Sequence, residues 1–131
     1  AGYHAAVYGE KSYNGVAIPS RFPLRDIRRG LPGDAADTQA RYIQAVVSMQ
    51  SAEMQNAALK PASAPLHSDI LVASVYVPNG QAVDSEKFPY KLRFLERLRA
   101  HLATLRGAEE PCVIGGDYNV APWPCDVYDP T

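Results

Sequence analysis

Two short polar segments that follow strand-like runs hold residue types that can do chemistry. Asp117 and Asn119 lie in GGDYNV directly after an apolar run, and Tyr76 ends a second apolar run shortly before Asn79. A carboxylate can hold a metal ion or take a proton from water, while amides and phenols can donate to anionic oxygens. Hard oxygen ligands suit Mg²⁺. This inventory favours metal-assisted hydrolysis of a phosphate ester.

The same polar segment is also typical of a turn. Glycine, aspartate and asparagine are ordinary turn residues, so GGDYNV alone leaves a plain turn and a site both open. Asp117 and Asn119 are two positions apart, so in an extended chain they would face the same side. Gly115 and Gly116 would let a substrate approach the backbone closely.

A helix between the two segments allows them to meet. Leucines recur at three- and four-residue intervals and predict one apolar stripe, made of Leu92, Leu95, Leu98, Leu102 and Leu105. Asp84 or Ser85 would cap the helix, Pro89 fits only its first turn, and Gly107 would end it. A strand–helix–strand crossover lays its two strands parallel, with their carboxyl ends at one edge of the sheet, where α/β folds place ligands.

The rest of the sequence reads mostly as strands. Runs at residues 3–7 and 14–18 predict a hairpin, residues 41–48 a strand with one buried face, and residues 70–77 and 112–116 the two strands of the crossover. Residues 21–32 predict a loop or an irregular edge. Residues 49–67 are Ala-, Ser- and Pro-rich and predict a long hairpin connection. Hairpins followed by a crossover predict an α/β layered fold with a sheet of mixed direction.

Composition sets the broad class. The 131 residues fit one domain, and 47% hydrophobic with 21% charged residues is typical of a soluble globular protein. No apolar run approaches the roughly 20 residues that would span a bilayer, and no signal peptide is recognisable, so no membrane association is expected. Cys112 and Cys125 match no metal-ligand or disulfide spacing, which favours reduced thiols and a cytoplasmic location.

The charge is balanced overall and basic locally. Thirteen basic and fourteen acidic residues give a net charge of −1. Residues 87–106 nevertheless carry six basic side chains and one acidic one, and the polar helix face is predicted to hold Lys91, Arg93, Arg97 and Arg99. Such runs are most often solvated faces.

Several motifs together resemble bacterial exodeoxyribonuclease III, in the apurinic/apyrimidinic (AP) endonuclease group of the endonuclease/exonuclease/phosphatase superfamily. The motifs are VYVPNG (75–80), EKFPYKLRFLERL (86–98), GGDYNVAP (115–122) and DVYDP (126–130), with KSYNGVAI (11–18) and DTQAR (37–41) upstream. The resemblance runs nearly end to end. It implies an α/β fold that is part of a four-layer α/β sandwich with mixed sheets, the DNase I-like architecture.

The resemblance also implies roles for individual residues. Asp117 matches the carboxylate that activates the attacking water, and Asn119 the amide that holds phosphate and metal oxygens. Tyr76 matches the active-site tyrosine near the scissile phosphate. The implied metal ion is Mg²⁺ or Mn²⁺, with Asp117 and Asn119 among its ligands.

Four further residues are implied to contact DNA. Asn79 matches a phosphate or backbone contact, and Arg41 an arginine that approaches the DNA strand. Lys87 and Lys91 are looser candidates, for which a solvated helix face is an equal alternative.

The resemblance implies a DNA repair nuclease that hydrolyses phosphodiesters at abasic sites and 3′ ends of duplex DNA. The family's domain is longer, and its N-terminal metal-binding glutamate and C-terminal Asp–His pair have no counterpart here. We therefore expect residues 1–131 to be the central part of one such domain, inactive alone, while the parent is monomeric. Inner faces at residues 70–77 and 112–116 would lack cover, which favours self-association. The alternatives are a small-molecule or lipid phosphodiesterase and a non-catalytic nucleic-acid- or protein-binding member of the same fold.

Overall fold

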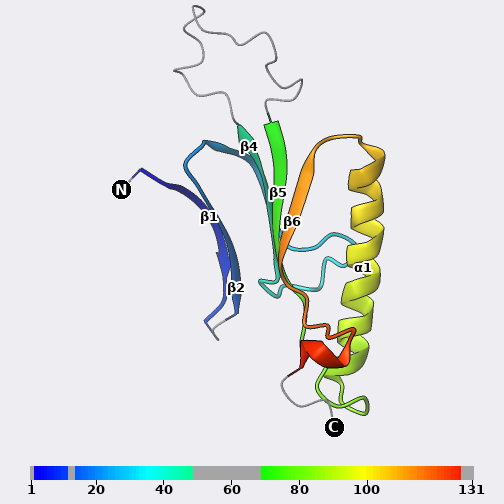
Figure 1. Ribbon diagram of the computed structural model, residues 1–131. Helices are drawn as coiled ribbons and strands as arrows, with labels where there is room; N and C mark the ends of the chain where they lie inside the picture. The colour runs from blue at the N-terminus through cyan, green and yellow to red at the C-terminus, as the bar shows by residue number, and fades with distance from the viewer. Residues whose placement is uncertain (1, 12–13, 49–68, 128–131) are drawn as a thin grey trace, which may run out of the picture.

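The computed structural model describes residues 2–11, 14–48 and 69–127 (Figure 1). Its elements are β1 (His4–Gly9), β2 (Gly15–Ser20), β3 (Leu24–Arg29), β4 (Tyr42–Ser48), β5 (Asp69–Tyr76), α1 (Lys87–Gly107), β6 (Cys112–Asp117) and the 3₁₀ turn η3 (Pro124–Asp126). The predicted α/β class is confirmed. Among the described residues, no helix is long and apolar enough to cross a membrane.

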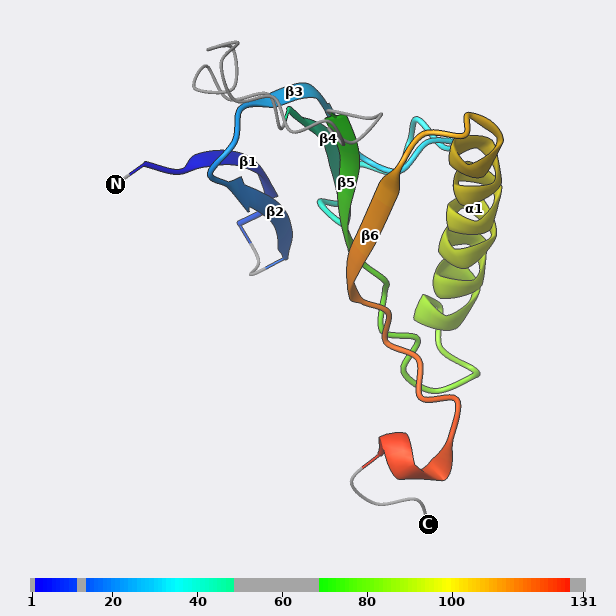
Figure 2. The same cartoon turned by 45° about the horizontal axis from the view of Figure 1, so that its top comes forward.

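The elements form three layers. β1 and β2 pair antiparallel in a two-stranded sheet, and a four-stranded sheet has the order β3-β4-β5-β6. Figures 1 and 2 show α1 against one face of the four-stranded sheet and the β1–β2 hairpin beyond its other face. β3, β4 and β5 are antiparallel neighbours, whereas β5 and β6 are parallel. The predicted mixed sheet and crossover are therefore both present.

The first core cluster lies between α1 and the four-stranded sheet. Its buried members are Leu31, Tyr42, Ala73, Val75, Val77, Phe94 and Leu98. Leu95 and Leu102 of the predicted stripe pack against this cluster, but Leu92 is 51% exposed. At about 100° per residue, Leu92 lies roughly 120° around the helix from Leu98, whereas Phe94 lies roughly 40° away. Phe94 therefore replaces Leu92 in the buried stripe.

The start of α1 also differs from the prediction. Glu86 occupies the N-cap position and makes no side-chain cap bond. The prediction named Asp84 or Ser85 as the cap; Ser85 instead donates its hydroxyl proton to the carbonyl of Gly80, 2.9 Å away. Ser85 thus stabilises the loop before the helix rather than the helix end. Gly107 ends the helix as predicted.

The second core cluster lies between the four-stranded sheet and the hairpin. Ala6, Val16, Ile18, Ile43 and Ala45 are buried there. Residues 42–45 are all buried, so β4 is covered on both faces rather than on the one face predicted. The additional cover is α1, which packs over Tyr42 and Gln44.

Gln44 is the buried polar residue of this strand, and it is hydrogen-bonded. The Tyr42 hydroxyl donates to its Oε1 at 3.0 Å, and Nε2 of His101 lies 2.9 Å from the same atom. Burial raises the pKa of Tyr42 to about 12, so its hydroxyl remains protonated at neutral pH. The half-buried His101 contributes to a structural network beneath α1.

Residues 21–32 contain an irregular edge strand, one of the two structures predicted for them. β3 pairs with β4, but the register shifts between Arg25 and Arg28, and Asp26 has a φ of 51°. The hairpin connection predicted for residues 49–67 lies outside the described residues. The strands on its two sides, β4 and β5, do pair antiparallel, as a hairpin requires.

Candidate active site

The two polar segments meet at one edge of the sheet. Tyr76 pairs with Asp117 at the end of the parallel β5–β6 ladder, and the N–H of Val77 donates to the carbonyl of Asp117 at 2.8 Å. The carboxylate of Asp117 is exposed, and a shallow open hollow adjoins it. The hollow is lined by Gly116, Asp117, Tyr118, Asn119, Val120 and Ala121. The juxtaposition predicted from the crossover is therefore present.

Asp117 and Asn119 are joined by a turn rather than by extended chain. Asn119 has a φ of 48°, in the left-handed region that asparagine tolerates. Its backbone N–H donates to Oδ1 of Asp117 at 2.8 Å, and its Nδ2 donates to the carbonyl of Val77 at 2.8 Å. GGDYNV is thus a turn and a candidate site at once, because the turn itself orients the carboxylate and leaves it open to solvent.

Gly116 serves the sheet rather than a substrate. Its φ is 146°, and a Cβ at this position would lie 1.9 Å from the carbonyl oxygen of Val75 on β5. A Cβ on Gly115 would meet nothing within 4 Å. Gly116 is therefore needed because it allows β6 to lie against β5. The predicted close approach of a substrate to the backbone does not explain this glycine.

Arg41 lies against Tyr76. Its Cζ is 4.8 Å from the centre of the Tyr76 ring, within the range of a cation–π contact. Its carbonyl accepts the Tyr76 N–H at 2.8 Å, and its Nε donates to Oε1 of Gln39 at 2.6 Å. Nη1 is buried without a hydrogen-bond partner among the described residues. The predicted DNA contact is thus brought to the same edge as Tyr76 and Asp117.

The remaining predicted contacts differ in exposure. Lys87 and Asn79 are exposed, and Oδ1 of Asn79 accepts the N–H of Gln81 at 3.0 Å in a turn. Lys91 is half-buried, and its Nζ donates to the carbonyl of Asn119 at 2.5 Å. Lys91 therefore holds the loop that carries Asn119, a position unlike a solvated helix face.

The donor set suits Mg²⁺ or Mn²⁺ in kind but is small. Asp117 and Asn119 offer hard carboxylate and amide oxygens of the type these ions prefer. In the part of the chain that the structure describes, no three His, Cys, Asp or Glu side chains are grouped closely enough to hold a metal ion. Asp117 and Asn119 would therefore supply only some of the oxygen ligands that such an ion needs.

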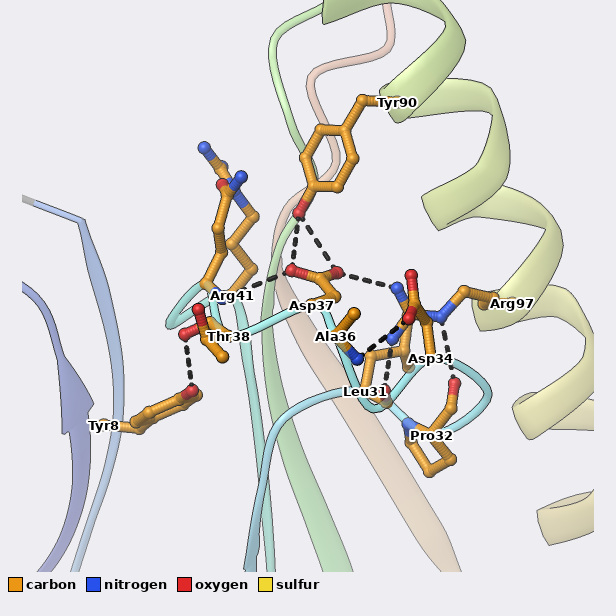
Figure 3. Close-up of polar contacts among 11 residues, drawn as sticks. Tyr8, Leu31, Pro32, Asp34, Ala36, Asp37, Thr38, Arg41, Tyr90 and Arg97 are labelled. Carbon is orange, nitrogen blue, oxygen red and sulfur yellow. Dashed lines mark hydrogen bonds and ion pairs between the residues drawn. The ribbon is translucent and has the colours of Figure 1, made fainter.

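Sequence reasoning missed a buried aspartate, Asp37, which pairs with two residues of α1. Asp37 accepts hydrogen bonds from Tyr90 and Arg97 of α1 (Figure 3). Arg97, predicted on the polar helix face, is in fact mostly buried in this ion pair. The partners are more than 50 residues apart in sequence, so no local pattern could have shown the pairing.

The comparisons with known proteins decide the family. A profile described as the endonuclease/exonuclease/phosphatase family matches residues 1–130. The chain belongs to this family. A curated relative is exodeoxyribonuclease III from Haemophilus influenzae, 30% identical over 127 residues, which cover 96% of this chain and 42% of that protein. The resemblance that the motifs predict is thereby confirmed.

Solved structures of this family share the fold. A 3′ phosphatase from Neisseria bound to a product DNA hairpin superposes with a TM-score of 0.75 at 35% identity, covering 98% of this chain and 42% of that chain. An AP endonuclease from Archaeoglobus fulgidus gives 0.71 at 38% identity, with coverages of 98% and 42%. The DNase I-like fold is therefore shown. The chain spans less than half the length of these relatives, and its place as the central part of a domain stays a prediction.

Proposed function

We propose that the natural protein is a DNA repair nuclease that hydrolyses phosphodiesters at abasic sites and at 3′ ends of duplex DNA. One observation carries the proposal: the parallel ends of β5 and β6 and the start of the antiparallel β4 lie at one edge of the sheet, which brings together Tyr76, Asp117, Asn119 and Arg41. The family includes an exodeoxyribonuclease III and an AP endonuclease with more than 95% of this chain aligned to each. A cytoplasmic location and a monomeric natural protein are part of the proposal.

Asp117 is the proposed general base. Its carboxylate is exposed; the N–H of Asn119 donates to Oδ1 at 2.8 Å, and Nδ2 of Asn119 makes a long contact of 3.4 Å with Oδ2, an oxygen that can also take a proton from water. The water oxygen then attacks phosphorus, and the bond from phosphorus to the leaving oxygen breaks. The Tyr76 phenol, at the paired position on β5, would donate to an anionic oxygen of the phosphate. Mg²⁺ or Mn²⁺, held by Asp117 and Asn119 among its ligands, would supply Lewis-acid stabilisation of negative charge.

DNA binding would rest on the backbone and on shape. Arg41, Asn79 and Lys87 are the proposed phosphate contacts, and such contacts position a duplex without reading its sequence. An abasic nucleotide lacks its base, which reduces the cost of extruding it from the helix. Selectivity for abasic sites would then follow from the lesion itself.

The test uses the natural protein with Mg²⁺ and four substrates. These are an abasic duplex, an intact duplex with recessed 3′ ends, an intact duplex closed by a loop at both ends so that it has no 3′ terminus, and an inositol phosphate. We expect cleavage of the first two, none of the last two, and complete loss with a chelator. Preference for inositol phosphate would favour the small-molecule phosphodiesterase alternative. DNA binding without turnover of any substrate would favour a non-catalytic member of the fold.

A further inference from the structure

A buried carboxylate fastens the loop of residues 31–41 to α1. The Asp37 side chain is only 7% exposed, and its Oδ2 lies 2.7 Å from Nη1 of Arg97, whose side chain is 14% exposed. Arg97 also donates through Nε to the carbonyl of Pro32 at 3.1 Å and through Nη2 to that of Leu31. One arginine of the helix thus binds the loop at three points (Figure 3).

Tyr90 provides a second attachment from the same helix. Its hydroxyl lies 3.2 Å from both carboxylate oxygens of Asp37. Burial and then the neighbouring carboxylate raise the pKa of Tyr90 to about 12, so the hydroxyl remains a donor at neutral pH. Asp37, Tyr90 and Arg97 form what we call the Asp37 clamp.

The clamp is connected to Arg41 by short links. Oδ1 of Asp37 accepts the N–H of Gln39 at 3.2 Å. Gln39 in turn accepts both from the Arg41 backbone N–H at 2.9 Å and from its Nε at 2.6 Å. The guanidinium so held lies over Tyr76.

The hairpin holds the same loop from the opposite side. The Tyr8 hydroxyl donates to the carbonyl of Thr38 at 2.9 Å, and the carboxylate of Glu10 accepts the N–H of Ala40. Just before Arg41, Asp37 is therefore bound to α1, while Thr38 and Ala40 are bound to the hairpin. These attachments on two sides restrict the positions that the Arg41 guanidinium can take.

We propose that the Asp37 clamp positions the active site: Tyr90 and Arg97 act through Asp37 and Gln39 to hold Arg41 over Tyr76. None of the three clamp residues lies at the exposed edge with Asp117, so they are positioning residues and not catalytic ones. The consequence for turnover rests on the proposed function, whereas the placement of Arg41 does not. A buried ion pair such as Asp37–Arg97 need not stabilise the folded protein. The test therefore measures the effect of the clamp on the position of Arg41 and not on the free energy of unfolding.

The test compares Tyr90→Phe with wild type in the natural protein. This change removes the hydroxyl whose single proton is shared between the two oxygens of Asp37, and it keeps the aromatic ring in the core. Protons of Arg41 above the Tyr76 ring should show upfield ring-current shifts by NMR, and these shifts should fall by at least half in Tyr90→Phe. Tyr3→Phe is the matched control, because it removes a hydroxyl that bonds to the exposed Arg21, away from the loop.

Kinetics provide the second readout. A displaced Arg41 should lower kcat roughly tenfold or more, because small errors in the position of site residues are costly. KM should rise as well, because Arg41 is also a proposed phosphate contact, and Tyr3→Phe should match wild type in both constants. Unchanged Arg41 shifts in Tyr90→Phe would overturn the positioning role, whether or not the protein is a nuclease. Reduced shifts with an unchanged kcat on a cleaved substrate would overturn the link to catalysis.

Discussion

At the scale of single residues, the site depends on backbone conformations as much as on side chains. Asn119 adopts a φ of 48° and so returns its N–H to Asp117, while its amide reaches the end of β5. Gly116, one residue before Asp117, brings β6 close to β5. The carboxylate is oriented because these neighbours fix the turn that carries it.

The close approach at Gly116 gives a sharp prediction. Gly116→Ala would place a methyl group against the Val75 carbonyl, so we expect the free energy of unfolding to fall by roughly 3 kcal/mol or more. Gly115→Ala, with open space around its Cβ, should change it by less than about 1 kcal/mol. Urea unfolding of the natural protein measures both. Equal effects of the two substitutions would contradict the proposed role of Gly116.

The sequence predicts the residue types of the site but not the reason for each. Asp117, Asn119 and Tyr76 follow from strand ends and from the crossover, which are local features. The need for Gly116 depends on the carbonyl of Val75, which lies on a strand 41 positions earlier and becomes its neighbour only in the folded sheet. Packing across strands therefore decides what spacing alone could not.

At the scale of elements, α1 organises the site in addition to covering the sheet. Its successive residues Tyr90 and Lys91 reach two different loops, one ending at Arg41 and one carrying Asn119. The leucine pattern predicts the helix and its end, yet Leu92 is exposed and Arg97 is mostly buried. Helical periodicity identifies a buried face only to within about one residue position, because each step turns the helix by about 100°.

The two lysines of α1 should behave differently towards DNA. Lys87 is exposed, so Lys87→Ala should flatten the dependence of log affinity on log salt by roughly one unit. Lys91→Ala should leave that slope unchanged and lower turnover, because its amine holds the carbonyl of Asn119. Binding of the natural protein to duplex DNA over a salt series measures both. A slope flattened equally by both changes would make Lys91 a direct phosphate contact.

At the scale of the whole molecule, cover is uneven across the four-stranded sheet. The sequence predicts uncovered inner faces at both residues 70–77 and 112–116, but the structure covers β5 with α1 on one face and the hairpin on the other. β6 is the more exposed strand, with Val113 58% exposed and no second strand partner among the described residues. The packing of the β1–β2 hairpin against the four-stranded sheet is a tertiary contact, and the residue pattern of each strand alone does not predict it.

This uneven cover predicts the behaviour of the isolated polypeptide 1–131. A free strand edge next to exposed apolar side chains favours pairing between copies, so we expect concentration-dependent self-association in sedimentation experiments. Val113→Lys should weaken it by placing a charge on that edge strand. Monomeric sedimentation of wild type at every concentration would contradict this expectation. We also expect the isolated polypeptide to be inactive, because a full set of metal ligands is not grouped among its described residues.

The proposed catalytic centre is tested most directly by Asp117→Asn in the natural protein, with hydrolysis of an abasic duplex in Mg²⁺ and duplex affinity as the readouts. The asparagine can still accept the N–H of Asn119, so the turn is kept while the base is lost. Asp34→Asn is the control, since Asp34 makes the same kind of turn bond, to Ala36, in an exposed loop. We predict a fall in turnover of roughly a thousandfold or more for Asp117→Asn with nearly unchanged affinity, and no fall for Asp34→Asn. Turnover within about tenfold of wild type would remove Asp117 from the mechanism and contradict the central claim.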